Sequence, residues 1–196
     1  MSHLPTLPEA ACPIAICGAG GIVNDAHLPA YRKAGFAVTG IYDQNREAAE
    51  RTAQRFEVPR VYGTLQEMAE DPDAAIIDIA VPATETHGVV NSVVGSGKGL
   101  LIQKPLGESM ESAYATVDVI ERSGVVAAVN QQMRWEPGVR TAQALAARGD
   151  LGEVFDISFS IFVDTPWNLW EWLKRKSTID VLYHSIHYLD SIRFIT

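Results

Sequence analysis

The sequence predicts an α/β protein with a parallel sheet that carries helices on both faces. This part is followed by the start of an α+β domain with a mostly antiparallel sheet. Two observations support the prediction. Apolar, β-branched runs alternate with helix-like segments up to about residue 150, which is the pattern of βαβ units. Beyond that point apolar and polar residues mostly alternate one by one, which suits an antiparallel sheet with one covered face.

The strands and helices of the first part follow one another in turn. Strands are expected over Ile14–Cys17, Ala37–Tyr42, Ala75–Val81, Leu100–Ile102 and Val125–Val129. Helices are expected over Asp25–Ala34, Arg46–Phe56, Leu65–Glu70, Thr86–Gly97, Met110–Ser123 and Val139–Arg148. The stretches DPDA, GSGKG and RSG each place Gly or Asp where a helix ends before the next strand, which supports this division.

A second domain is expected to begin near Gly149–Glu153. This boundary divides the chain into residues 1–150 and residues 151–196. The second part contains an alternating strand over Val154–Val163, an aromatic loop and a helix from about Ser177 to the end. One strand and one helix cannot form a domain, because the edges of the strand stay unpaired. We therefore expect a C-terminally truncated second domain, and we expect the exposed strand edge to drive homo-oligomer formation.

Composition excludes several classes of function. The net charge of -8 over 196 residues disfavours binding to nucleic acid or to an anionic membrane. We see no secretory signal and no apolar run long enough to span a bilayer, so the expected compartment is the cytoplasm. An extended chain would separate Cys12 and Cys17 by roughly 16 Å, which is beyond disulfide reach, so both are expected to be reduced thiols.

A glycine-rich turn follows the first strand. Gly18 permits a tight turn and Gly20 lets the backbone approach a pyrophosphate, as in the Rossmann fingerprint G-x-G-x-x-G, whose third position is here Val23. Asp43 lies 23 residues after Gly20 at the end of the second strand, where a carboxylate accepts hydrogen bonds from a ribose diol. Its charge would repel a 2′-phosphate, which favours NAD, while Arg46 leaves NADP open. The alternative is a plain turn and a surface aspartate.

The stretch LLIQKPLGES places Gln103 and Lys104 at the end of another strand. Ligands of open α/β sheets bind at the carboxyl ends of the strands. A lysine there can hydrogen-bond a substrate hydroxyl and relay its proton when it is partly desolvated. The alternative is a solvated lysine at a strand end.

The C-terminal helix carries a second group of polar residues. His184, His187 and Asp190 follow one another at intervals of three, and Asp180 and Tyr183 precede the two histidines by four, so they share one side of a helix. They are interpreted as a histidine general base with an orienting partner. A metal site is disfavoured because further ligands are not evident, and helix-surface histidines are the plain alternative.

A tryptophan-rich stretch and a histidine of the first helix also stand out. The stretch PWNLWEW holds three tryptophans, which either wall a sugar-binding pocket or pack as core or interface. His27 falls inside the first helix, away from the expected nicotinamide end, and is interpreted as structural.

Seven motifs in order resemble the Gfo/Idh/MocA family of glucose-fructose and inositol dehydrogenase-like oxidoreductases. They are GAGGIVNDAHLPAY, GIYD, VPATETH, QKPLG, NQQMRWEP, GDLGEVFDI and HSIHYLD. The resemblance covers essentially the whole chain. It implies an N-terminal Rossmann domain and a C-terminal domain with a large, mostly antiparallel sheet that often mediates oligomerisation.

The resemblance also implies a set of site residues. The cofactor would be held by Gly18, Gly20, Gly21, Ile22, Asp43, Pro82, Thr84, His87, Gln103, Lys104, Arg134 and Trp135. In QKP, Lys104 matches the catalytic lysine of the family's Glu-Lys-Pro signature, and Gln103 departs from the usual glutamate. Arg134 and Trp135 match an Arg-aromatic pair close to the nicotinamide.

The family pattern D-x-x-x-H-x-x-D fits the last helix in two registers. One register starts at Asp180 and His184 and places His187 on the final Asp position. The other uses His187 and Asp190 and replaces the first Asp by Tyr183. We favour the second, because HYLDSIRFIT continues like the family's helix after its catalytic histidine.

These motifs lead to one expected function and two rivals. The expected function is an NAD-dependent (or NADP-dependent) dehydrogenase that acts on a sugar, a cyclitol or a related polyol. The first rival is a non-catalytic NAD-binding or regulatory module, or a truncated pseudo-enzyme of the same family. The second is a redox-neutral reaction through transient oxidation at bound NAD.

Overall fold

The computed structural model describes residues 10–162, residue 174 and residues 179–196. These residues fall into two compact units that divide between Asn130 and Gln131, and each unit is described by itself. The boundary near residues 149–153 stays a prediction. The tryptophan-rich stretch PWNLWEW lies outside the described residues.

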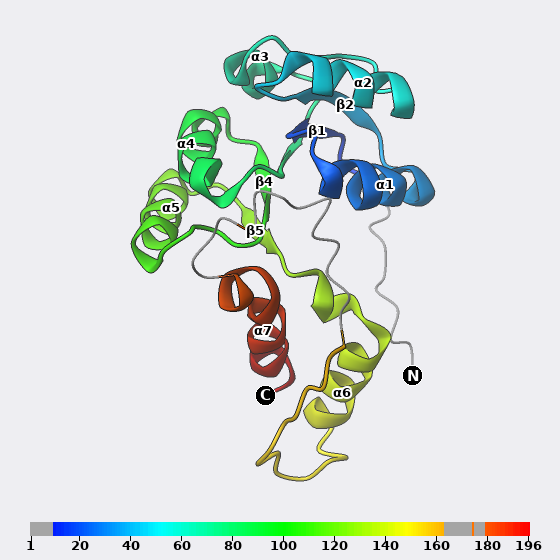
Figure 1. The fold of residues 1–196 in the computed structure, drawn as a ribbon, viewed down its shortest axis with the longest axis vertical. Helices are drawn as coiled ribbons and strands as arrows, with labels where there is room; N and C mark the ends of the chain where they lie inside the picture. Colours follow the sequence, from blue (N-terminus) through cyan, green and yellow to red (C-terminus); the bar gives the residue numbers. More distant parts are fainter. Residues whose placement is uncertain (1–9, 163–173, 175–178) are drawn as a thin grey trace. The chain divides into compact units, whose positions relative to one another are not determined.

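The first unit is built on a five-stranded parallel sheet (Figure 1). Its strands are β1 (Ile14–Cys17), β2 (Val38–Tyr42), β3 (Ile76–Ile79), β4 (Gly99–Gln103) and β5 (Ala127–Asn130). The order across the sheet is β2-β1-β3-β4-β5, and every pair is parallel. A single parallel bridge joins Ile41 of β2 to Val61. If Val61 is counted as a vestigial strand, the order becomes the Rossmann order 3-2-1-4-5-6, so the predicted parallel sheet is confirmed.

The helices of this unit match the sequence pattern closely. They are α1 (Leu28–Ala34), α2 (Arg46–Phe56), α3 (Leu65–Glu70), α4 (Ala83–Val93) and α5 (Met110–Ser123). The bounds of α2, α3 and α5 are those predicted, since Asn45, Thr64 and Ser109 each cap the first turn with a side-chain oxygen. Helix α4 begins earlier than predicted, directly after Pro82, whose fixed φ suits a helix start.

Two apolar clusters cover the two faces of the sheet. One joins β3 and β4 to α4 through residues such as Ile77, Val90 and Ile102. The other joins β1 and β2 to α1 and α2, and it includes Ile16 and the fully buried Val23. Val23 therefore fills the core under the glycine turn. The layers are those of a doubly wound sheet, with α4 and α5 side by side (Figure 1).

The second unit contains helices in its described residues. These are α6 (Pro137–Ala147), preceded by a 3-10 turn (Gln132–Trp135), and α7 (Ile186–Ile195), preceded by a π-helical turn (Val181–Ser185). The predicted start of the last helix near Ser177 lies outside the described residues. The predicted strand over Val154–Val163 is wrong for residues 154–162, which form no strand. An isolated alternating segment does not become a strand unless a neighbouring strand takes up its backbone hydrogen bonds, and no such neighbour lies among the described residues.

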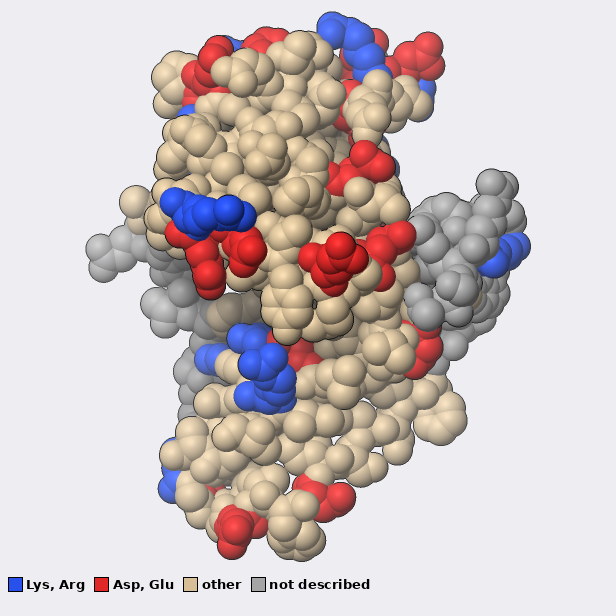
Figure 2. Space-filling view, turned by 90° about the vertical axis from the view of Figure 1, so that its left-hand side faces the viewer, with Lys and Arg blue, Asp and Glu red and all other residues tan. Residues whose placement is uncertain are grey.

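Surface charge and helix length bear on the expected partners. Figure 2 shows acidic and basic side chains close together on one face, without a continuous basic surface on the described part of that face. Among the described residues, none of the helices combines the length and apolar composition needed to cross a bilayer.

Candidate functional site

The candidate site lies at the carboxyl ends of the strands in the first unit. Strand β1 lies between β2 on one side and β3 on the other, and the chain continues from β1 to β2. This reversal of strand order is the topological switch point, where open α/β sheets bind ligands. The glycine turn, Asp43, Pro82 and Lys104 follow β1, β2, β3 and β4, so the topology brings these predicted residues to one edge.

The glycine turn requires glycine at one position and leaves open space at another. Gly18 has a φ of +116°, and a Cβ on it would lie 2.3 Å from the carbonyl oxygen of Ala80. Both facts exclude a larger side chain. Gly20 has no heavy atom within 4 Å of the position its Cβ would take. The backbone at Gly20 is therefore open to solvent, so a phosphate group can approach it closely.

Asn24 orders this turn and was not predicted from the sequence. Its side-chain amide donates to the carbonyl oxygens of Ala19 (2.9 Å) and Gly20 (3.0 Å). The amide group also forms hydrogen bonds with Thr52 of α2. These bonds hold the turn's carbonyl groups on the helix side. The helix that begins at Gly21 leaves its first N–H groups without intrahelical partners, and those groups attract anions.

Asp43 connects the end of β2 to the glycine turn. One carboxylate oxygen accepts a hydrogen bond from the backbone N–H of Ala19 at 2.7 Å, and the other accepts from Asn45 at 2.8 Å. A carboxylate offers about four lone-pair sites, so both oxygens keep capacity for the two hydroxyls of a ribose. Together with Gly18, Gly20, Gly21 and Ile22, this residue fits a dinucleotide cofactor.

Lys104 is partly buried, and burial holds its pKa below the ordinary value for lysine. Its backbone N–H donates to the side-chain oxygen of Gln103 at 2.7 Å. Gln103 is buried, with an exposed fraction of 9%. A lysine in this state gives up its proton more easily than a solvated one, which suits acid–base chemistry.

The three residues predicted along the cofactor after β3 lie at the start of α4. Pro82 precedes the first turn, Thr84 is exposed, and His87 lies one turn further on. The Nδ1 of His87 lies 3.4 Å from the hydroxyl oxygen of Thr116 in α5, so this ring is held against the neighbouring helix.

A buried polar group lies beside the predicted lysine, and we call it the His27 cluster: His27, Tyr31, Asp78, Gln103 and Asn130. His27 Nδ1 lies 2.7 Å from a carboxylate oxygen of Asp78, to which Tyr31 also donates at 2.8 Å. His27 Nε2 faces the amide nitrogens of Gln103 (3.2 Å) and Asn130 (3.3 Å). Burial, and then the charge of Asp78, raise the pKa of Tyr31.

The residues of the His27 cluster are far apart in the sequence, and none of the motifs brings them together. Asp78 stands in an apolar strand 51 residues from His27, and Gln103 is 76 residues away. The sheet register pairs Gln103 with Asn130 across β4 and β5, which places both amides on one face. A buried charged residue in a central strand is uncommon, and that is the one signal that pointed to a partner for Asp78.

In the second unit, Arg134 pairs with Asp190. Two guanidinium nitrogens donate to the two carboxylate oxygens, each at 2.6 Å, and these bonds raise the pKa of Arg134. The guanidinium group also lies 5.2 Å from the ring centre of Phe194. Trp135 is exposed, and Arg140 lies over its ring.

The predicted histidines are placed on this unit's last helical segment. His187 Nε2 lies 3.4 Å from the side-chain nitrogen of Gln132, and His184 Nδ1 lies 3.9 Å from Asp180. Tyr183 is buried, with an exposed fraction of 8%. Lys104 belongs to the first unit and these residues to the second, so their joint action is part of the proposal below.

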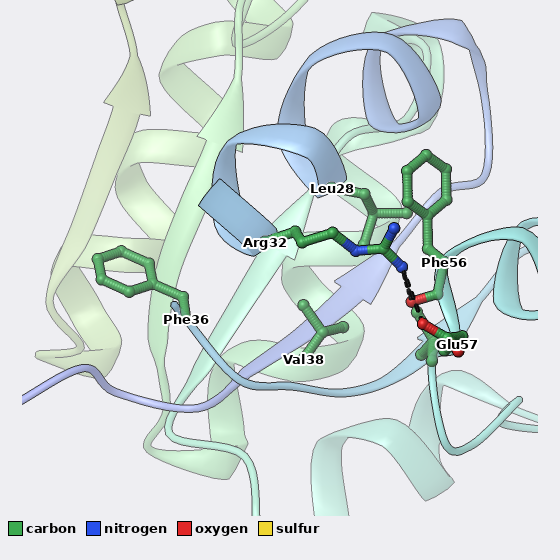
Figure 3. Close-up of a pocket in the computed structure, with 7 residues that line it drawn as sticks. Leu28, Arg32, Phe36, Val38, Phe56 and Glu57 are labelled. Carbon is green, nitrogen blue, oxygen red and sulfur yellow. Dashed lines mark hydrogen bonds and ion pairs between the residues drawn. The ribbon is translucent and has the colours of Figure 1, made fainter. Parts of the chain in front are cut away.

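A small hollow lies elsewhere on the first unit (Figure 3). It is lined by Leu28, Arg32, Phe36, Val38, Phe56, Glu57 and Val58. Arg32 donates to the carbonyl oxygen of Phe56 at 3.0 Å. Val38 begins β2, while the hollow's other residues come from α1 and the ends of α1 and α2. The hollow therefore lies at the opposite edge of the sheet from the glycine turn.

Comparison with known proteins identifies a family and several relatives. The sequence profile of the Gfo/Idh/MocA family, described as an oxidoreductase family with an NAD-binding Rossmann fold, matches residues 12–131. D-apiose dehydrogenase of Paraburkholderia graminis is 26% identical over 182 residues, which make up 89% of this chain and 47% of the relative. The chain thus spans about half the length of this relative.

Two solved structures share the fold. An oxidoreductase from Agrobacterium radiobacter, in complex with NAD+, L-tartaric acid and magnesium, gives a TM-score of 0.80 at 22% identity over 95% of this chain and 55% of that one. Levoglucosan dehydrogenase, in complex with NADH and levoglucosan, also gives 0.80 at 22% identity over 95% of this chain and 54% of that one.

Proposed function

Since the chain belongs to the Gfo/Idh/MocA family of oxidoreductases with an NAD-binding Rossmann fold, we propose that it is an NAD-dependent dehydrogenase of a sugar, a cyclitol or a related polyol. The observation that carries this proposal is the convergence of the glycine turn, Asp43 and the partly buried Lys104 at one edge of the sheet. Bound nicotinamide would supply the hydride acceptor or donor. All other parts of the reaction are assigned to the chain's own residues.

The glycine turn and Asp43 hold the dinucleotide. Open space above Gly20 and the first N–H groups of the helix from Gly21 receive the pyrophosphate. Asp43 accepts the hydroxyls of the adenosine ribose. Its charge disfavours a 2′-phosphate, so NAD is proposed over NADP. Pro82, Thr84 and His87 lie along the cofactor at the start of α4.

Lys104 holds the reacting hydroxyl and moves its proton. In the oxidation direction the neutral amine accepts a hydrogen bond from the substrate hydroxyl and takes up the proton as the C–H bond breaks. Burial favours the neutral amine by lowering the pKa of Lys104. His187 of the second unit shares this proton transfer, and Tyr183 stands where the family pattern has its first aspartate. In the other register of that pattern, His184 is the histidine that shares the transfer.

Arg134 and Trp135 are proposed to border the nicotinamide end. The bidentate bonds from Asp190 fix the plane of the Arg134 guanidinium, so it presents one orientation to a ligand. The polyol class follows from the relatives, one of which acts on D-apiose and another of which binds levoglucosan by name. We also propose that the protein acts in the cytoplasm as a homo-oligomer.

The test compares Lys104→Ala with the unchanged full chain. We expect the variant to bind NADH with an affinity within about threefold, because the glycine turn and Asp43 are assigned the main contacts with the dinucleotide. We expect turnover of a panel of D-apiose, levoglucosan and myo-inositol to fall by about 10²–10⁴-fold, the usual contribution of a positioned acid or base. Turnover that survives in the variant would remove Lys104 from the mechanism.

The rival assignment is a non-catalytic NAD-binding module. The observation that favours it is the tyrosine at position 183, which is buried and stands where the family pattern has an acid. NADH binding by the full chain, with no turnover of any polyol and no exchange of hydride with bound cofactor, would establish the module. Hydride exchange without net turnover would instead indicate the redox-neutral reaction.

A further inference from the structure

The imidazole of His27 joins four elements of the first unit. The residue ends the π-helical turn Val23–His27 that leads from the glycine turn into α1. Its ring contacts Asp78 of β3 through Nδ1, and the amides of Gln103 in β4 and Asn130 in β5 through Nε2. The exposed fraction of His27 is 6% and that of Asp78 is 0%. Both ring nitrogens of this buried histidine therefore have hydrogen-bond partners.

The direction of each hydrogen bond follows from the Lys104 backbone. The Oε1 of Gln103 accepts from the N–H of Lys104 at 2.7 Å, so the other end of that amide, the Nε2 donor, must face the ring. His27 Nε2 therefore accepts, and the ring proton lies on Nδ1. Nδ1–H then donates to Asp78, whose same oxygen also accepts from Tyr31. A continuous path of oriented bonds runs from Asp78 to the backbone of Lys104.

We propose that His27 is a positioning residue for Lys104, acting through the side chain of Gln103. By accepting from the Gln103 amide, His27 fixes its rotamer, and that rotamer ties down the backbone N–H of the lysine. This inference rests on the proposed function, in which Lys104 moves the substrate proton. It also gives a reason for the amide of Gln103, because a carboxylate at this position would present no N–H donor to His27 Nε2.

Two substitutions of His27 separate its two contacts. An asparagine amide nitrogen takes roughly the place of Nδ1, so His27→Asn keeps the bond to Asp78 and loses the acceptor for Gln103. A glutamine amide reaches the place of Nε2, so His27→Gln keeps that acceptor and loses the bond to Asp78. Tyr31→Phe is the matched control, because it removes the other donor to Asp78 and leaves the Gln103 side unchanged.

The three variants are compared in the full chain with NAD+ and the polyol that the chain turns over fastest. We expect His27→Asn to lower kcat by about 10–100-fold, with the NADH affinity close to that of the unchanged chain and with a fall in Tm similar to that of His27→Gln, because each variant loses buried contacts of the ring. We expect His27→Gln to restore kcat to within about threefold even though its Tm falls, and Tyr31→Phe to leave kcat unchanged. The proposal is wrong if kcat follows Tm across the three variants, because that pattern belongs to a purely structural histidine.

A second readout does not depend on turnover. The side chain of Lys104 is followed by a 13C-methyl titration of the reductively methylated protein with NADH bound, with Lys104→Arg to assign the signal. We expect His27→Asn to change the titration midpoint of Lys104, and His27→Gln to leave it near that of the unchanged chain. If the chain turns over no polyol, the proposed function fails and this titration still decides the role of His27. An unchanged midpoint in His27→Asn overturns the role.

Discussion

Asp43 accepts a hydrogen bond from the backbone N–H of Ala19, and the two atoms are 2.7 Å apart. The residue assigned to the cofactor's ribose therefore also holds the glycine turn against the end of β2. Its second oxygen accepts from Asn45, the residue that caps α2. One carboxylate thus connects the glycine turn, proposed to hold the pyrophosphate, to the end of β2 and the start of α2.

We expect Asp43→Asn to relax the preference for NAD over NADP. The amide oxygen still accepts from Ala19, so the turn should keep its conformation, although the backbone N–H of Asn45 loses its acceptor. The charge that repels a 2′-phosphate is gone. The ratio of NADPH to NADH affinity, measured by fluorescence titration, should rise by about tenfold, which corresponds to about 1.4 kcal/mol. If the ratio stays the same and the Tm is normal, Asp43 does not bind the ribose of the cofactor.

Gly18 and Gly20 should respond differently to the same change. At Gly18 the φ of +116° and the carbonyl group of Ala80 leave no place for a methyl group, so Gly18→Ala should destabilise the fold by about 1–3 kcal/mol or more. At Gly20 the space is open, so Gly20→Ala should keep its Tm and weaken NADH binding by about tenfold or more.

Urea unfolding and NADH titration of both variants provide the measurement. Gly35→Ala is a useful companion, because Gly35 also has a positive φ but ends α1 away from the turn. It should lose stability without a specific loss of NADH affinity. If Gly20→Ala binds NADH normally, the pyrophosphate does not approach this part of the backbone.

The bidentate pair between Arg134 and Asp190 should stabilise the second unit and orient the arginine. Arg134→Lys keeps the charge and loses the planar fork, so it should bind Asp190 through one contact. We expect a loss of stability of about 1 kcal/mol or less, since the arginine side chain is 42% exposed. We expect a larger effect on kcat/KM, by about tenfold, if the guanidinium borders the nicotinamide. A change in Tm with normal kcat/KM would mark the pair as structural.

The two thiols should differ sharply in reactivity. Burial in β1, and then the charges of Asp43 and Asp78, raise the pKa of Cys17 to about 12, while Cys12 is exposed. Because the thiolate is the reactive form, a thiol reagent at pH 8 should modify Cys12 at once and Cys17 only after denaturation. Mass spectrometry of the labelled peptides distinguishes the two, and fast labelling of Cys17 in the native protein would contradict its buried position.

Local signals were enough to predict most of the first unit. Helix α2 was predicted to the residue because Asn45 caps it and its apolar positions recur at helical spacing. The turn and the positions of Asp43 and Lys104 followed from the rule that parallel strands place their carboxyl ends together. Each of these elements is determined by residues that lie close together in the sequence, so a short stretch of chain is enough to predict it.

The remaining features depend on contacts between distant residues. In the sequence Asn24 is an ordinary helix residue, and its contact with the glycine turn is evident only in the folded structure. The partners of His27 come from three different strands. The segment 154–162 alternates like a strand, yet forms none among the described residues, since strand formation needs a neighbour to bond with. Periodicity predicts which face is apolar, but it does not identify the partner.

Asp71 should make the stability of the first unit sensitive to acid. Burial alone would raise its pKa, but hydrogen bonds from the Tyr62 hydroxyl (2.5 Å) and the Asp73 backbone, with the charge of Arg60, hold the pKa below the ordinary value. A carboxyl group with a lower pKa in the folded state than in the unfolded state binds fewer protons when folded. Its stabilising contribution is therefore present above pH about 4 and is lost as the pH falls through the folded-state pKa.

The measurement is urea unfolding between pH 7 and pH 3 for the unchanged chain and for Asp71→Asn. The variant should lose about 1–3 kcal/mol at pH 7, because the hydroxyl of Tyr62 and the guanidinium of Arg60 lose a charged acceptor. It should also show a flatter dependence of stability on pH below 4, since the titrating group is gone. Tyr62→Phe removes the hydroxyl alone and should give an intermediate loss at pH 7. Parallel pH curves for the unchanged chain and Asp71→Asn would mean that other carboxyl groups cause the acid sensitivity.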